Sequence, residues 1–174
     1  MEKIYIFLQN RISHLLAEEG FSRDVIAAVV SVSVDDVPNV RNRVKALESL
    51  KARPDFEPLA IGFKRVVNII RKSGQAEEGA IPEAVDTVLF EHDSEGALLD
   101  TFKAVDLRVS EAMANNDFDR ALVDIASLKD AVDRFFDGVM VMAEDAAIRR
   151  NRLALLGQIA GLFGKFADFS KLST

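Results

Sequence analysis

VDRFFDGVMVMAEDAAIRRNRLALL (residues 132–156) is the stretch that most shapes the interpretation of this chain. It holds the end of one amphipathic helix, a break at Asp137–Gly138 and the short apolar run Val139–Met142. A second helix then begins, with its leucines on one side and three cations facing away from them: Arg149, Arg150 and Arg152. The pattern predicts a hinge between two packed helices that presents positive charge.

Helical spacing of apolar residues continues on both sides of this stretch. It predicts helices over about 3–19, 22–30, 38–51, 55–72, 94–114, 117–135 and 144–167. The first helix carries an apolar stripe with the members Ile4, Phe7, Leu8, Ile12, Leu15 and Leu16. Residues 73–93 lack a sustained period and contain two Gly and one Pro, so we expect a long connection there. No convincing strand pair is present, and we expect residues 1–174 to form a single all-α domain, a bundle of about seven helices.

The helix over 55–72 has the clearest division into two faces. Its apolar face contains Phe56, Leu59, Phe63, Val66, Val67 and Ile70. The other side is mostly basic and carries Lys64, Arg65, Asn68, Arg71 and Lys72. In the predicted helix over 38–51, Arg41 and Arg43 lie on the sides that face solvent.

Composition excludes several classes of protein. The chain has 174 residues, no Cys and a net charge of −6. Disulfides, thiolate catalysis and Cys-ligated zinc are therefore excluded. No apolar run approaches the roughly 20 residues that a membrane-spanning helix needs. A signal peptide is not indicated, and we expect a cytoplasmic protein without membrane contact.

The charges are unevenly distributed. Residues 41–72 carry 9 basic and 3 acidic side chains, and residues 149–174 carry 5 and 1. Between them, residues 73–148 carry 5 basic and 18 acidic side chains. The acidic net charge argues against generic nucleic-acid binding, including DNA. Two basic segments that converge could still form a local polyanion site, and the simpler alternative is that they are solvated helix faces.

A catalytic or metal-binding constellation is missing. The two histidines, His14 and His92, are far apart in sequence, and neither follows a carboxylate by three positions. Two histidines without cysteine do not make a zinc site. No glycine loop of the phosphate-binding kind occurs. We therefore expect this chain alone to be non-catalytic, with no metal and no cofactor of its own.

Two segments carry a family resemblance: RPDFEPLAIGFKRVVNIIRK (53–72) and FFDGVMVMAEDAAIRRNRLALLGQIAGLFGKFADFSKL (135–172). They resemble the C-terminal part of the bacterial glycyl-tRNA synthetase β subunit, and the similarity extends over nearly the whole chain. That region of the family is similar to the all-helical anticodon-binding domain of the class I arginyl-type tRNA synthetases. The resemblance implies that this chain is a fragment of a larger β subunit.

The resemblance also implies a function and partners. The parent enzyme is a glycine–tRNA ligase that charges tRNA(Gly) with glycine, using ATP and magnesium, as an α2β2 assembly with its α subunit. The aminoacylation site would lie outside this fragment, whose role would be to bind the anticodon region and position the tRNA. The alternative is a helical protein-interaction module for subunit assembly without direct RNA contact.

An anticodon stem-loop offers phosphates and unstacked bases. Phosphates call for Lys and Arg, and splayed bases for amides, guanidinium planes or aromatic rings. The chain has no Trp and a single Tyr, so stacking would fall to arginine. Asn68 could contact a base edge or could equally cap or bridge helices inside the bundle. The stronger expectation for RNA binding is the 64–72 face, and a second set comprises Arg41, Arg43, Arg149, Arg150 and Arg152.

Overall fold

In the computed structural model, which describes residues 2–34, 36–76 and 84–173, every regular element is a helix. The α-helices are α1 (Glu2–Glu18), α2 (Arg23–Val30), α3 (Val37–Lys51), α4 (Phe56–Ala76), α5 (Asp93–Ala114), α6 (Phe118–Ala126), α7 (Lys129–Gly138) and α8 (Ala146–Phe166). Two short 3-10 helices are η1 (Thr87–Leu89) and η2 (Phe169–Lys171). The all-α prediction is confirmed.

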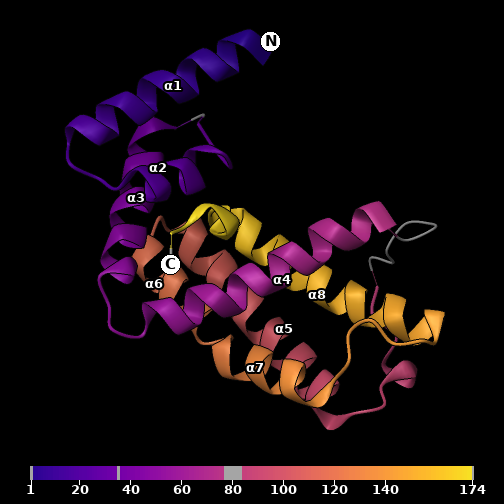
Figure 1. Cartoon of the computed structure of the whole chain (residues 1–174). Coiled ribbons are helices and arrows are strands. Elements are labelled where there is room, and N and C mark those ends of the chain that lie inside the picture. Colours follow the sequence, from indigo (N-terminus) through magenta and orange to yellow (C-terminus); the bar gives the residue numbers. More distant parts are fainter. Residues whose placement is uncertain (1, 35, 77–83, 174) are drawn as a thin grey trace.

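The centre of the fold is the pair α4 and α8, which lie side by side (Figure 1). Both helices are amphipathic, and their apolar faces meet in an aromatic cluster. The rings of Phe63 and Phe163 lie 4.2 Å apart, and Phe169 of η2 meets Phe63 edge-on at 5.5 Å. All three phenylalanines are fully buried. This packing fixes α4 with its opposite face outward.

The remaining helices surround this pair. Helix α5 packs against α6 and α7, and α7 also contacts α4. The N-terminal helices join the later ones through α2 on η2 and α3 on α6. Hydrogen bonds join the N-terminal and C-terminal parts of the chain: the Asp168 N–H donates to the Ala28 carbonyl at 2.9 Å, and the Ser173 N–H donates to Asp24 Oδ2 at 2.7 Å.

The structure divides the predicted helix over 117–135 into α6 and α7. The Ser127 hydroxyl donates to the Asp124 carbonyl at 2.6 Å, in competition with the helical backbone pattern. Leu128 lies at the break and is fully buried. The helical spacing of apolar residues in the sequence therefore continues across the break and gives no sign of two separate helices. Of the predicted connection over 73–93, residues 73–76 belong to α4, residues 77–83 lie outside the described ranges, and η1 occupies 87–89.

Helix α1 differs most from its sequence pattern. It forms as predicted and lies at the outer edge of the fold (Figure 1). Only Ile12 and Leu16 of its apolar stripe are buried, whereas the other four members are exposed: Ile4, Phe7, Leu8 and Leu15. The spacing of apolar residues therefore predicted the helix correctly, but most of the apolar stripe is not buried.

Candidate nucleic-acid interface

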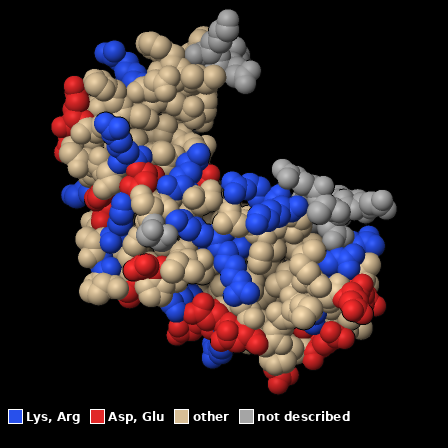
Figure 2. Space-filling view, in the orientation of Figure 1, with Lys and Arg blue, Asp and Glu red and all other residues tan. Residues whose placement is uncertain are grey.

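Helix α4 presents one polar face to solvent. Phe63 and Val66 anchor its other side and are fully buried. Arg65, Arg71 and Lys72 are exposed, and two further polar residues of the helix are half-buried: Lys64 and Asn68. In Figure 2, Lys and Arg side chains gather over the middle of the visible face, where α4 runs. The five α4 residues expected from the sequence thus share one helix and one side of the bundle.

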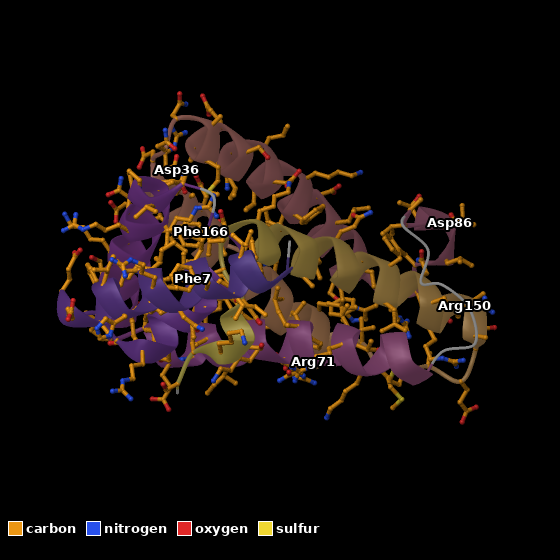
Figure 3. All side chains as sticks on the ribbon, turned by 90° about the horizontal axis from the view of Figure 1, so that it is seen from above. Phe7, Asp36, Arg71, Asp86, Arg150 and Phe166 are labelled. Atoms are coloured by element: carbon orange, nitrogen blue, oxygen red, sulfur yellow. The ribbon has the colours of Figure 1, made fainter. Side chains whose placement is uncertain are left out.

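Two of these residues contact each other. Arg71 Nη2 donates to Asn68 Oδ1 at 3.0 Å, so the amide oxygen orients a guanidinium on the same helix. This contact lies within one helix and does not bridge two helices, and a contact of Asn68 with a base stays a prediction. Arg71 points away from the bundle (Figure 3).

Arg65 lies on an aromatic ring. Its guanidinium carbon is 3.9 Å from the centroid of Phe136, near the end of α7. A planar guanidinium stacks well on an aromatic face, and such contacts contribute about 0.5–2 kcal/mol. Among the residues that the structure describes, Arg65 forms no ion pair with a carboxylate. Its charge therefore remains available to a ligand.

A pocket of about 500 Å³ opens beside Arg65. One wall is α4, with Arg65 and Ile69, and the other is the end of α7 with the link Val139–Met142. The backbone is extended at Val139, with φ −132° and ψ 127°, and bends at Val141 and Met142. Val139 and Val141 are 7% exposed and face the core, whereas Met140 is 74% and Met142 51% exposed.

Two arginines of α8 donate to backbone carbonyls of the link and of the residues that directly follow it. Arg152 Nη1 donates to the Met140 carbonyl at 3.1 Å. Arg149 Nη1 donates to the carbonyls of Ala143 at 2.8 Å and Glu144 at 3.2 Å. The guanidinium groups thus satisfy backbone carbonyls that no helix or sheet satisfies.

Arg152 is itself buried, at 6% exposure, and pairs with Glu95, which is fully buried. Arg152 Nε lies 3.0 Å from Glu95 Oε1, and Arg152 Nη2 lies 2.9 Å from Glu91 Oε2. Burial acts to raise the pKa of Glu95, but hydrogen bonds from Arg152 and from the backbone N–H groups of Glu91 and His92 outweigh it and lower that pKa. The Arg152 guanidinium is therefore used inside the fold, on Glu95, Glu91 and the Met140 carbonyl.

The other expected cations are dispersed. Arg41 pairs with Glu19 at 2.7 Å on the N-terminal side of the fold. Arg43 is half-buried and donates to the Lys165 carbonyl at 3.0 Å, at the end of α8. Burial lowers the pKa of Arg43, against the opposing effect of Asp36. Arg150 is exposed near the start of α8, at the opposite end of that helix from Lys165 (Figure 3). The two basic segments therefore do not form one continuous cluster of free cations.

Sequence reasoning missed the residues that shape the pocket, namely Phe136, Met140 and Met142. The alternating Val and Met over 139–142 was a usable signal, because period-two alternation predicts an extended segment with two different faces. Within the described ranges, no cluster of metal-binding side chains occurs and no helix is long and apolar enough to cross a bilayer.

The chain is an all-α bundle with a basic face on α4, and it belongs to the DALR anticodon binding domain family, whose sequence model matches residues 59–167. The match runs from α4 to the end of α8. The chain is also 53% identical, over 99% of its length, to the glycine–tRNA ligase beta subunit of Desulfatibacillum aliphaticivorans.

The corresponding beta subunits of Desulforapulum autotrophicum and Geotalea daltonii are 44% and 46% identical over 98% and 96% of this chain. The chain spans about a quarter of the length of these curated relatives, at 24%, 24% and 23%.

Proposed function

We propose that this chain is the C-terminal anticodon-binding domain of a glycine–tRNA ligase β subunit. The observation that carries the proposal is the coincidence of the family match with the basic face of α4. The domain would hold the stem-loop of tRNA(Gly) so that the acceptor end reaches a catalytic site elsewhere in a cytoplasmic α2β2 assembly. ATP and magnesium would act at that distant site. Family membership does not favour an interaction module without RNA contact.

The chemistry of α4 supports phosphate binding. Arg71 and Lys72 project from a helix whose opposite side is fixed in the aromatic core. Positive groups on a rigid element bind the backbone of a nucleic acid through phosphate contacts that position it without reading sequence. Because the chain as a whole carries a net charge of −6, we expect such binding at this basic face and not over the rest of the surface.

The proposal is tested by measuring the affinity of the chain for a tRNA(Gly) transcript across a series of salt concentrations. For the double variant Arg71→Ala/Lys72→Ala we expect weaker binding and a smaller slope of log K against log salt, by about 1 per lost phosphate contact. The matched control is Lys103→Ala/Arg134→Ala, which removes the same charge from α5 and α7.

Binding to a tRNA with a substituted anticodon loop is measured in parallel. We expect it to be weaker than binding to tRNA(Gly), because the loop would contact the domain directly. Wild-type affinity and salt slope in the α4 double variant would show that this face does not bind the tRNA.

A further inference from the structure

We propose that the pocket between α4 and the 139–142 link binds one unpaired nucleobase of the RNA, stacked on Arg65. This inference rests on the proposed function and assigns a separate task to a separate part of the surface. The exposed cations at 71–72 would contact phosphates, whereas the pocket would accept a base displaced from the loop.

Arg65 provides the platform for stacking. Its guanidinium lies 3.9 Å above the Phe136 ring, which holds the plane in a fixed orientation, and the residue remains exposed. A base placed on the outer side of this plane would extend the stack to ring, guanidinium and base. Guanidinium planes serve RNA-binding proteins in this way alongside aromatic residues.

Met140 and Met142 complete an apolar wall. Met140 and Met142 are 74% and 51% exposed, so both point outward and contribute little to the core. The thioether is polarizable and makes favourable contacts with aromatic rings. Their exposure is therefore more readily explained by a planar apolar ligand than by packing.

The lining favours a base over a phosphate. Arg65 is the only cation among the lining residues that the structure describes, and Asp137 adds a carboxylate. A carboxylate repels a phosphate but accepts hydrogen bonds from the amino groups of bases. A volume of about 500 Å³ lies within the range of small-ligand pockets, roughly 300–1,000 Å³.

Arg149 and Arg152 act as positioning residues for this pocket. Arg152 donates to the Met140 carbonyl inside the link, and Arg149 donates to the carbonyls of Ala143 and Glu144, which directly follow the link. Arg149 and Arg152 would then serve RNA binding through the shape of the pocket and not through contact with phosphate.

The test uses fluorescence anisotropy with a stem-loop RNA carrying the anticodon loop of tRNA(Gly), and with the same stem-loop made abasic in the loop. For Met140→Ser/Met142→Ser we expect a Kd about 5- to 100-fold higher for the intact loop, with an unchanged salt slope, since no charge is lost. The abasic RNA should bind both proteins equally. Leu107→Ser, an exposed apolar residue of α5, is the control.

Arg65→Lys removes the planar guanidinium group but keeps the positive charge. It should weaken binding of the intact loop and keep the salt slope, whereas Arg65→Ala should change both. A methionine double variant that binds the intact loop within twofold of wild type would overturn the pocket assignment while leaving the proposed function standing. A wild-type chain that fails to distinguish the stem-loop from a duplex of equal length would overturn both.

Discussion

Arg152 and Glu95 form a buried ion pair between α8 and α5, in which each charge compensates the other. Removal of one partner leaves an uncompensated charge in the core. For Arg152→Ala we expect a loss of about 3–5 kcal/mol in the free energy of unfolding, measured by urea denaturation. The exposed neighbour variant Arg150→Ala should stay within about 0.5 kcal/mol of wild type.

The double variant Arg152→Met/Glu95→Gln tests the cause of that loss. Because it removes both charges while the amide oxygen of the introduced glutamine can still accept the backbone N–H groups of Glu91 and His92, it should recover most of the stability. A double variant as unstable as Arg152→Ala would show that the hydrogen bond to the Met140 carbonyl, and not the buried charge, dominates.

The lowered pKa of Glu95 predicts a dependence of stability on pH. A carboxyl whose folded-state pKa lies below its ordinary value of 4.5 stabilises the fold above that pH, and this contribution is lost as pH falls through the folded-state pKa. The stability gap between wild type and Glu95→Gln should therefore be largest above about pH 4.5 and narrow below it.

Urea titrations at several pH values measure this gap. For Glu57→Gln, an exposed change at the start of α4, the free energy of unfolding should follow the same dependence on pH as in wild type. A gap that stays constant from pH 7 down to acid unfolding would contradict the role assigned to the Glu95 charge.

At the scale of elements, the end of α7 fits closely against the start of α5. A Cβ on Gly138 would lie 2.5 Å from His92 Cε1 and 2.9 Å from His92 Nδ1. That ring nitrogen accepts the Ser94 N–H at 3.2 Å and caps α5. Gly138→Ala should displace the ring and destabilise the protein by about 0.5–2 kcal/mol, the typical value of an N-cap.

Gly161→Ala is the matched control for this substitution. Gly161 lies in α8 with no atom within 4 Å of an added Cβ. Alanine there should be neutral or stabilising by about 0.5–1 kcal/mol, because glycine is unfavourable inside a helix. Thermal unfolding of both variants gives the comparison, and equal melting temperatures would show that His92 moves aside at no cost.

The helices were predictable from the sequence because apolar spacing of 3.6 residues is a local property. The same locality limited the prediction at Ser127, where a side-chain hydrogen bond breaks a helix whose apolar period continues through Leu128. The basic face of α4 was also predictable, since one amphipathic helix fixes which residues lie opposite Phe63. Arg152 could not be placed, because its partner Glu95 is 57 residues away in sequence.

At the scale of the whole molecule, α1 contributes little to the core through its N-terminal half. Phe7 is 62% exposed and Leu16 only 3%. We expect Phe7→Ala to leave the free energy of unfolding within about 0.5 kcal/mol of wild type, while Leu16→Ala costs about 2–5 kcal/mol.

Phe7→Ala should also reduce self-association of the isolated chain, because it removes part of an exposed apolar surface. Light scattering at increasing protein concentration measures this effect. A large loss of stability in Phe7→Ala would show that the first turns of α1 pack on the bundle in solution.

The outward methionines of the 139–142 link make the surface beside α4 sensitive to oxidants. Conversion of a thioether to a sulfoxide replaces a flexible apolar group with a polar one, and reductases reverse the reaction. Under mild peroxide treatment, Met140 and Met142 should oxidise before the half-buried Met113, as peptide mass spectrometry would reveal. The oxidised protein should keep its melting temperature, because the core faces of the link are valines, and should lose affinity for the intact RNA loop until it is reduced.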